Sequence, residues 1–83
     1  MSLNIKQKSF FETNSLPLAA TLLCFSCPLD SLKKDQEGKT IFIFELTPQL
    51  SRVKERFWTR LLKVEPNLFW ETQRFLKSRI YGE

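Results

Sequence analysis

Apolar and polar positions are most clearly patterned in the middle of the chain, at residues 39–46. Ile41 and Ile43 point to one side of an extended chain, while Phe42 and Phe44 point to the other. Large apolar groups on both sides are typical of a strand that is covered on both faces or lies in the middle of a sheet. We therefore expect the rest of the fold to be organised around this strand.

A short strand and a helix are predicted before it. Residues 8–13 favour a first strand. The side chain of Asn14 or Ser15 then caps a helix, and Pro17 lies in its first turn, where a missing N–H has no cost. The helix extends to about residue 25 and is almost wholly apolar, so we expect nearly all of it to be buried.

A second strand and a turn are predicted between this helix and the central strand. Residues 27–32 match the strand, and Pro28 favours a strand start or a sheet edge. Residues 33–38 form a polar connection, in which Gly38 can adopt the positive φ that a tight turn requires. The second strand and the central strand are therefore expected to form a hairpin.

Two more helices are predicted after the central strand. Thr47 caps the first and Pro48 occupies its first position, which is a strong signal for a helix start. This helix covers about residues 48–62, and Pro66 opens the next over about residues 66–81. The residues expected on the core side are Leu50, Val53, Phe57 and Leu61 of the first helix, with Trp58 beside them, and Leu68, Phe75 and Leu76 of the second.

These elements predict a small α+β domain of order β-α-β-β-α-α, in which helices pack a two- or three-stranded sheet. Residues 1–7 are expected to form a flexible N-terminus, and residues 8–83 a single domain. With 83 residues the chain has room for one core. Its 42% apolar content, which includes eight Phe, argues against disorder.

Cysteine use and the longest apolar run bear on where the protein works. Two Cys and no His do not make a disulfide scaffold, so we expect a reducing, cytoplasmic setting. The apolar run at residues 16–29 is too short to span a bilayer and lacks the small-residue cleavage site of a signal peptide. No membrane partner is expected.

Two groups of residues imitate catalytic or metal sites. Cys24 and Cys27 have the C-x-x-C spacing, but the chain offers no further Cys and no His to complete a zinc site. Glu12, Asp30 and Glu45 could meet at one end of the sheet, as in metal-dependent nucleases, but the Lys that follows the second acid in those sites is missing. We therefore expect no catalytic residue, no metal and no cofactor, and a protein that is not an enzyme.

The positive charge is concentrated in the C-terminal part of the chain. The formal net charge is +4, and residues 47–83 carry eight basic against four acidic residues, while residues 1–46 are neutral overall. A localised basic surface favours an anionic partner such as nucleic acid.

The last two predicted helices interleave cations with aromatic groups. Arg52, Arg56 and Arg60 are spaced four residues apart, and Lys63 continues this stripe. A second stripe is formed on the last helix by Trp70, Arg74, Lys77 and Tyr81. Such a surface suits base stacking with phosphate contact. It suits an acidic protein partner or an interface between subunits equally well, and it is also compatible with a solvated basic face in which Arg74 covers Trp70.

Several segments together resemble a known group of proteins. They are Phe11-Glu12-Thr13-Asn14, the helix at residues 18–24, the strand at residues 41–45 and the ending at residues 76–81. In this order they are similar to short, uncharacterised bacterial and phage proteins that are classified only as a domain of unknown function. Such families often have Gly after the first helix, where this chain has Ser26. The resemblance implies a free-standing domain on mobile elements or beside nucleic-acid-processing genes, and no catalytic residues.

The sequence therefore favours a small, basic, non-enzymatic module that binds DNA or RNA through its last two helices, as an accessory part of a larger nucleoprotein machine. The cations of the two stripes would contact phosphates, and the two aromatic residues would stack on bases. The alternative is a protein–protein adaptor or homodimeric subunit that makes no contact with nucleic acid.

Overall fold

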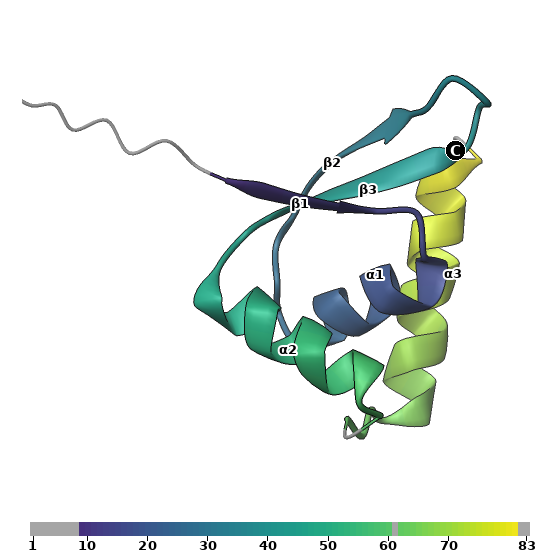
Figure 1. Ribbon diagram of the computed structural model, residues 1–83. Helices are drawn as coiled ribbons and strands as arrows, with labels where there is room; N and C mark the ends of the chain where they lie inside the picture. The colour runs from purple at the N-terminus through teal and green to yellow at the C-terminus, as the bar shows by residue number, and fades with distance from the viewer. Residues whose placement is uncertain (1–8, 61, 82–83) are drawn as a thin grey trace, which may run out of the picture.

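The structure, a computed structural model, describes residues 9–60 and 62–81 and confirms the predicted order of elements (Figure 1). Its strands are β1 (Phe10–Thr13), β2 (Leu29–Lys34) and β3 (Thr40–Glu45). Its helices are α1 (Leu16–Cys24), α2 (Pro48–Trp58) and α3 (Pro66–Ile80). The fold is α+β, with one three-stranded antiparallel sheet. Both the predicted flexible segment, residues 1–7, and the predicted core residue Leu61 lie outside the described residues.

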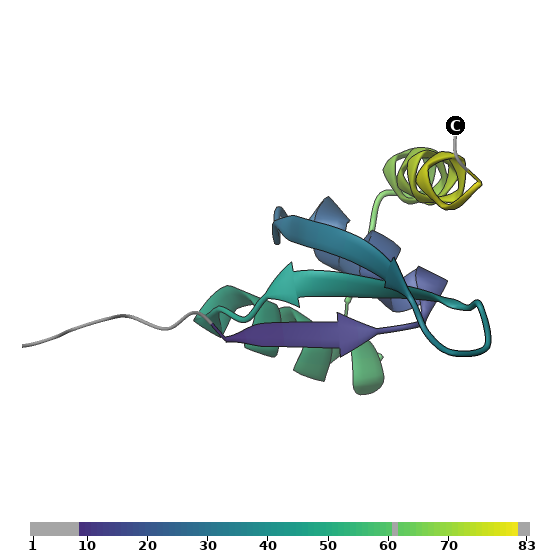
Figure 2. The ribbon, with the colours of Figure 1, turned by 90° about the horizontal axis from the view of Figure 1, so that it is seen from above.

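β3 lies in the middle of the sheet, whose strand order is β1-β3-β2. Phe42 and Phe44 are fully buried on the face that the helices cover, while Ile41 and Ile43 are half-buried on the other face. Figures 1 and 2 show α1 and α2 on one side of the sheet and α3 beside its β2 edge. The sequence pattern allowed this strand either to be covered on both faces or to lie in the middle of the sheet, and the second of these predictions is confirmed. No described helix covers the second face.

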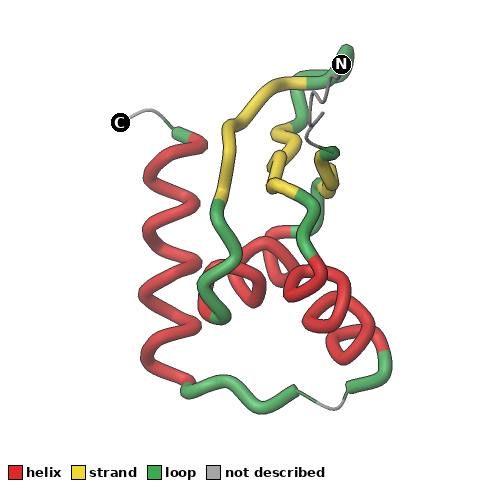
Figure 3. Tube along the Cα trace, turned by 90° about the vertical axis from the view of Figure 1, so that its left-hand side faces the viewer, coloured by secondary structure: helices red, strands yellow, loops and turns green. Residues whose placement is uncertain are grey.

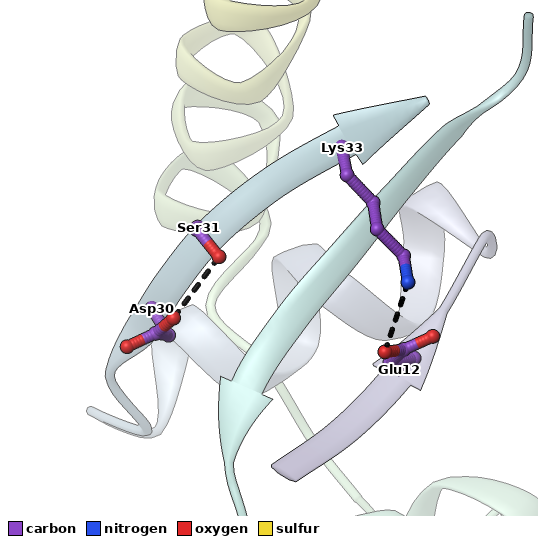
Figure 4. A network of polar contacts seen from close by, with 4 residues as sticks. All are labelled: Glu12, Asp30, Ser31 and Lys33. Atoms are coloured by element: carbon purple, nitrogen blue, oxygen red, sulfur yellow. Dashed lines mark hydrogen bonds and ion pairs between the residues drawn. The ribbon is translucent and has the colours of Figure 1, made fainter. Parts of the chain in front are cut away.

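An ion pair crosses this open face. Lys33 Nζ of β2 reaches over β3 to Glu12 Oε2 of β1 at 3.2 Å (Figure 4). Both side chains are about half exposed, so the pair stabilises the sheet by less than about 1 kcal/mol. The ion pair thus links β2 to β1, the two edge strands, which are not hydrogen-bonded to each other.

α1 is the centre of the helical layer. Its cap is Ser15, whose Oγ accepts a hydrogen bond from the N–H of Leu18 at 3.2 Å. All five residues from Leu18 to Leu22 are buried, as the apolar sequence predicted. One of them is polar, and its hydroxyl is satisfied because Thr21 Oγ1 donates to the carbonyl oxygen of Pro17 at 2.8 Å.

α1 ends in a Schellman motif, although the chain has no glycine there. The N–H of Cys27 donates to the carbonyl of Leu22 at 2.9 Å, and that of Ser26 donates to Leu23 at 3.0 Å. Ser26 has a φ of 64°, the left-handed conformation in which glycine is usual. The hydrogen bond from Cys27 holds this residue in the core, and β2 begins at Leu29, two residues later than predicted.

The β2–β3 hairpin is closed by one aspartate and one glycine. Asp35 Oδ1 accepts hydrogen bonds from the N–H groups of Glu37 at 2.8 Å and Lys39 at 2.9 Å. Gly38 has a φ of 83°, as the turn prediction required. The sequence therefore placed the hairpin correctly, although β2 itself is shifted.

The core faces of the last two helices follow the sequence only in part. On α2, Leu50 and Val53 are buried and Phe57 is half-buried, as predicted, whereas Trp58 is 65% exposed. The core side of α3 is Leu76 with the half-buried Phe69 and Ile80. The prediction for Leu68 and Phe75 was wrong, since they are 45% and 49% exposed. None of the helices that the structure describes has the length and apolar character to cross a membrane.

Candidate functional site

Two of the predicted phosphate-binding arginines share one surface of α2. Thr47 and Pro48 begin this helix, and the apolar side that starts with Leu50 faces the core. Arg52 and Arg56 are consequently exposed on the other side, one turn apart. With Glu55 and Thr59 they line a hollow on the surface of α2.

The predicted arginine stripe stops at Arg56. α2 ends at Trp58 instead of about residue 62, and the next two residues leave the helix. Arg60 has a φ of 63°, and its N–H donates to the carbonyl of Phe57 at 3.2 Å. Because the chain turns here, Arg60 does not continue the helical spacing, and the exposed Lys63 lies in the connection to α3.

Arg60 instead contributes to a cleft that the sequence did not predict. The cleft has a volume of about 340 Å³ and lies where α1, the end of α2 and the start of α3 meet. Its lining is mostly apolar, and its polar residues are Arg60 and the buried Thr21. The sequence gives no signal for this cleft. The chain turns into it at Arg60, which has a left-handed backbone conformation, and neither Gly nor Asn stands there to indicate such a turn.

The aromatic stripe on α3 forms as the sequence predicted. Glu65 caps this helix, with its Oε1 accepting from the N–H of Leu68 at 2.7 Å. The four residues of the stripe are exposed on one side of the helix, and they are Trp70, Arg74, Lys77 and Tyr81. Tyr81 follows the last helical residue, but its N–H still donates to the carbonyl of Lys77 at 3.0 Å, so the stripe is continuous.

The stripe presents two aromatic rings and two cations to solvent. Trp70 is 56% exposed and Tyr81 is 82% exposed. The guanidinium carbon of Arg74 lies 4.8 Å from the centroid of the Trp70 ring, which is a cation–π contact.

The residues of the two helices do not form one surface. α2 and α3 both pack on α1, which lies between them (Figures 1 and 2). Figure 3 shows α2 and α3 on opposite sides of α1. The predicted site therefore divides into an arginine pair on α2, a cation in the cleft and the aromatic stripe on α3. That these residues bind nucleic acid stays a prediction.

In the described residues, the cysteine pair and the acidic residues that resembled a metal or catalytic site make ordinary structural contacts. Cys24 Sγ donates to Thr72 Oγ1 at 3.6 Å, which joins α1 to α3. Burial raises the pKa of the Cys27 thiol, so it stays protonated at neutral pH. Glu12 pairs with Lys33, and Asp30 accepts from the hydroxyl of Ser31 at 3.0 Å (Figure 4). Within residues 9–60 and 62–81, no three Cys, Asp or Glu side chains are grouped as a metal site.

Comparison with curated proteins and with solved structures found no match. A family model does match, over residues 8–82, and its description is a domain of unknown function, DUF5659. This confirms the resemblance to an uncharacterised family, whereas the bacterial and phage origin of its members stays a prediction. The chain belongs to the DUF5659 family.

Proposed function

We propose that this chain is a small nucleic-acid-binding module whose contact surface is the stripe on α3. The observation that supports this most is the exposure of Trp70 and Tyr81 on one side of a helix, beside the cations Arg74 and Lys77. Exposed aromatic rings beside cations bind bases by stacking and phosphates by charge, and each stacked base contributes roughly 1–3 kcal/mol.

The proposed ligand is single-stranded DNA or RNA. Stacking requires unpaired bases, which a duplex does not offer without base flipping. The stripe runs from Trp70 to Tyr81, and at a rise of 1.5 Å per residue it is about 16 Å long. A short oligonucleotide would therefore cover α3 alone, and Arg52 and Arg56 on α2 would contact only a longer strand that passes around the domain. In this proposal the protein is a non-enzymatic accessory component of a nucleoprotein assembly in the cytoplasm, in a mobile-element setting.

The test uses the two tryptophans as separate reporters. The Trp58→Phe variant leaves Trp70 as the sole indole, and the Trp70→Phe variant leaves Trp58, which lies on α2 outside the stripe. We expect a single-stranded oligonucleotide of about four nucleotides, which matches the length of the stripe, to quench the first variant and not the second. Quenching of both or of neither would contradict the assignment to α3.

The salt dependence of the affinity counts the phosphate contacts. With Arg74 and Lys77 as the two cations in contact, the slope of log K against log salt for a single strand should be about −1.4. Lys77→Ala should reduce the slope by about 0.7, while Arg56→Ala should leave it unchanged for the short oligonucleotide. The adaptor or homodimer alternative predicts no response of either variant to any oligonucleotide.

A further inference from the structure

α3 carries a second exposed surface, on the flank opposite the aromatic stripe. Leu68 and Phe75 lie two turns apart on this flank and are 45% and 49% exposed. Thr72 lies between them, and Arg79 one turn beyond, at the spacing of residues that face a partner helix. The guanidinium carbon of Arg79 lies 5.8 Å from the centroid of the Phe75 ring. We refer to Leu68, Thr72, Phe75 and Arg79 as the Leu68/Phe75 ridge.

The ridge is more apolar than a solvated helix surface requires. Within α3, which the structure describes in full, only Leu76 is fully buried. A helix that rests on its domain through one narrow side normally presents polar groups elsewhere. In α3 the aromatic stripe and the ridge leave only a narrow polar strip between them, at Asn67, Glu71 and Ser78. Large exposed apolar side chains that share one side of a helix favour a protein interface.

The charges of α3 indicate which partner fits the ridge. The acidic residues Glu65 and Glu71 lie at the N-terminal end of the helix and in its first half. All three of its cations follow in the second half, at Arg74, Lys77 and Arg79. Of these charges only Glu65 and Arg79 lie next to the ridge, and in a copy of the helix that runs in the opposite direction each Arg79 meets the Glu65 of the other copy.

An antiparallel pair of helices also lets the apolar side chains of the ridge pack against one another. If Leu68 of one copy packs on Phe75 of the other, two-fold symmetry repeats the same contact at Phe75 and Leu68. Thr72, which is half-buried and hydrogen-bonded to Cys24 of α1, then lies next to the two-fold axis, at the margin of the contact that faces α1. The same register brings Arg79 beside Glu65 of the second copy. The contact is isologous and closed, as dimers require.

From this geometry we propose that the chain forms an antiparallel homodimer through the Leu68/Phe75 ridge of α3. The proposal is independent of nucleic-acid binding, because Trp70 and Tyr81 lie on the opposite flank and stay exposed in the dimer. A single helix pair is at or below the lower end of specific interfaces, which bury about 1,200 Å² or more, so we expect a dissociation constant in the micromolar range.

The first test is the molecular mass of the full chain by sedimentation equilibrium, from low micromolar to near-millimolar concentration. The wild-type protein should pass from monomer to dimer. Leu68→Glu and Phe75→Glu should each raise the dissociation constant by about tenfold or more, because each places a charge at the centre of the contact. Trp70→Glu is the matched control, since it puts the same charge on the other flank of the same helix and should leave dimerisation unchanged.

The second test fixes the direction of the helices by disulfide formation in a Cys24→Ser background. In an antiparallel pair, a mixture of Leu68→Cys and Phe75→Cys proteins should cross-link under mild oxidation, whereas neither variant alone should. A parallel pair would cross-link each variant alone. That result would overturn the proposal, as would a wild-type chain that stays monomeric throughout, or a dimer that both glutamate variants leave intact. Circular dichroism of each variant checks that the fold is retained.

Discussion

Truncation of two adjacent residues of α3 should destabilise the fold to very different extents. Leu76 is 0% exposed and packs in the core between α3 and α1, while Phe75 is half in water. We expect Leu76→Ala to lower the free energy of unfolding by about 2–3 kcal/mol, and Phe75→Ala by about 0.5 kcal/mol, although phenylalanine is the larger side chain.

The magnitude for Leu76 follows from its burial. Removing the isopropyl end takes three carbon atoms out of the core, at about 0.8 kcal/mol each for the transfer alone, and a cavity adds to this cost. α3 lies at the edge of the domain and can move toward α1, so the value should lie in the lower half of the 2–5 kcal/mol typical of Leu→Ala. A domain of 83 residues has a total stability of about 4–12 kcal/mol, so this loss is a large part of it.

The magnitude for Phe75 is small because two terms oppose each other. The lost packing of a half-exposed ring and its contact with Arg79 together cost about 1 kcal/mol. Alanine then recovers about 0.5 kcal/mol through its higher helix propensity.

Urea denaturation followed by far-ultraviolet circular dichroism measures both changes. The protein is kept at low micromolar concentration, so that dimerisation does not contribute. With an m-value of about 1 kcal/mol/M, the midpoint should fall by about 2–3 M for Leu76→Ala and by about 0.5 M for Phe75→Ala. Equal shifts, or a larger one for Phe75→Ala, would refute the assignment of the core side of α3.

Three further changes test the turns and the buried thiol. Ser26→Gly should raise stability by about 0.5–1 kcal/mol, because it relieves the left-handed strain of a side chain and this gain exceeds the extra entropy of the unfolded chain; a lower urea midpoint would contradict it. Gly38→Ala should lower stability by a similar amount, about 0.5–1 kcal/mol, because alanine is strained at the positive φ of this turn. Steric contact does not contribute, since the added Cβ would meet nothing within 4 Å. An unchanged midpoint would show that the turn tolerates a side chain. Burial raises the pKa of Cys27, so an aromatic disulfide reagent should modify Cys24 first and Cys27 only as the chain unfolds. The same raised pKa makes stability fall as the pH rises past the ordinary thiol value of about 8.5, and the decline should be absent in Cys27→Ala.

The elements that the sequence predicted correctly have strong local signals. The side chain of Thr47 and the ring of Pro48 both require a helix start at that point, and the structure begins α2 there. The alternation around Phe42 and Phe44 fixed the position of β3, and Gly38 fixed its turn. In each case one residue type has few conformations that it tolerates, so the local sequence decides the structure.

The features that the sequence did not predict depend on tertiary contacts. Ser26 and Arg60 end their helices in a conformation that glycine usually adopts, so no residue type announced those ends. The orientation of α3 was ambiguous because apolar residues lie on three of its sides, and packing on α1 selected the one that contains Leu76. The separation of α2 from α3 was likewise decided by where α1 lies, and so the predicted basic surface is divided.

The titration of the Trp58→Phe protein with a short single-stranded oligonucleotide, at low and at moderate salt, tests the central proposal most directly. We expect quenching of Trp70 fluorescence at low salt that weakens as salt is added and is lost in a variant that also carries Arg74→Ala and Lys77→Ala. Unchanged Trp70 fluorescence at low salt, at oligonucleotide concentrations up to the near-millimolar range, would contradict the assignment of a nucleic-acid-binding surface to α3.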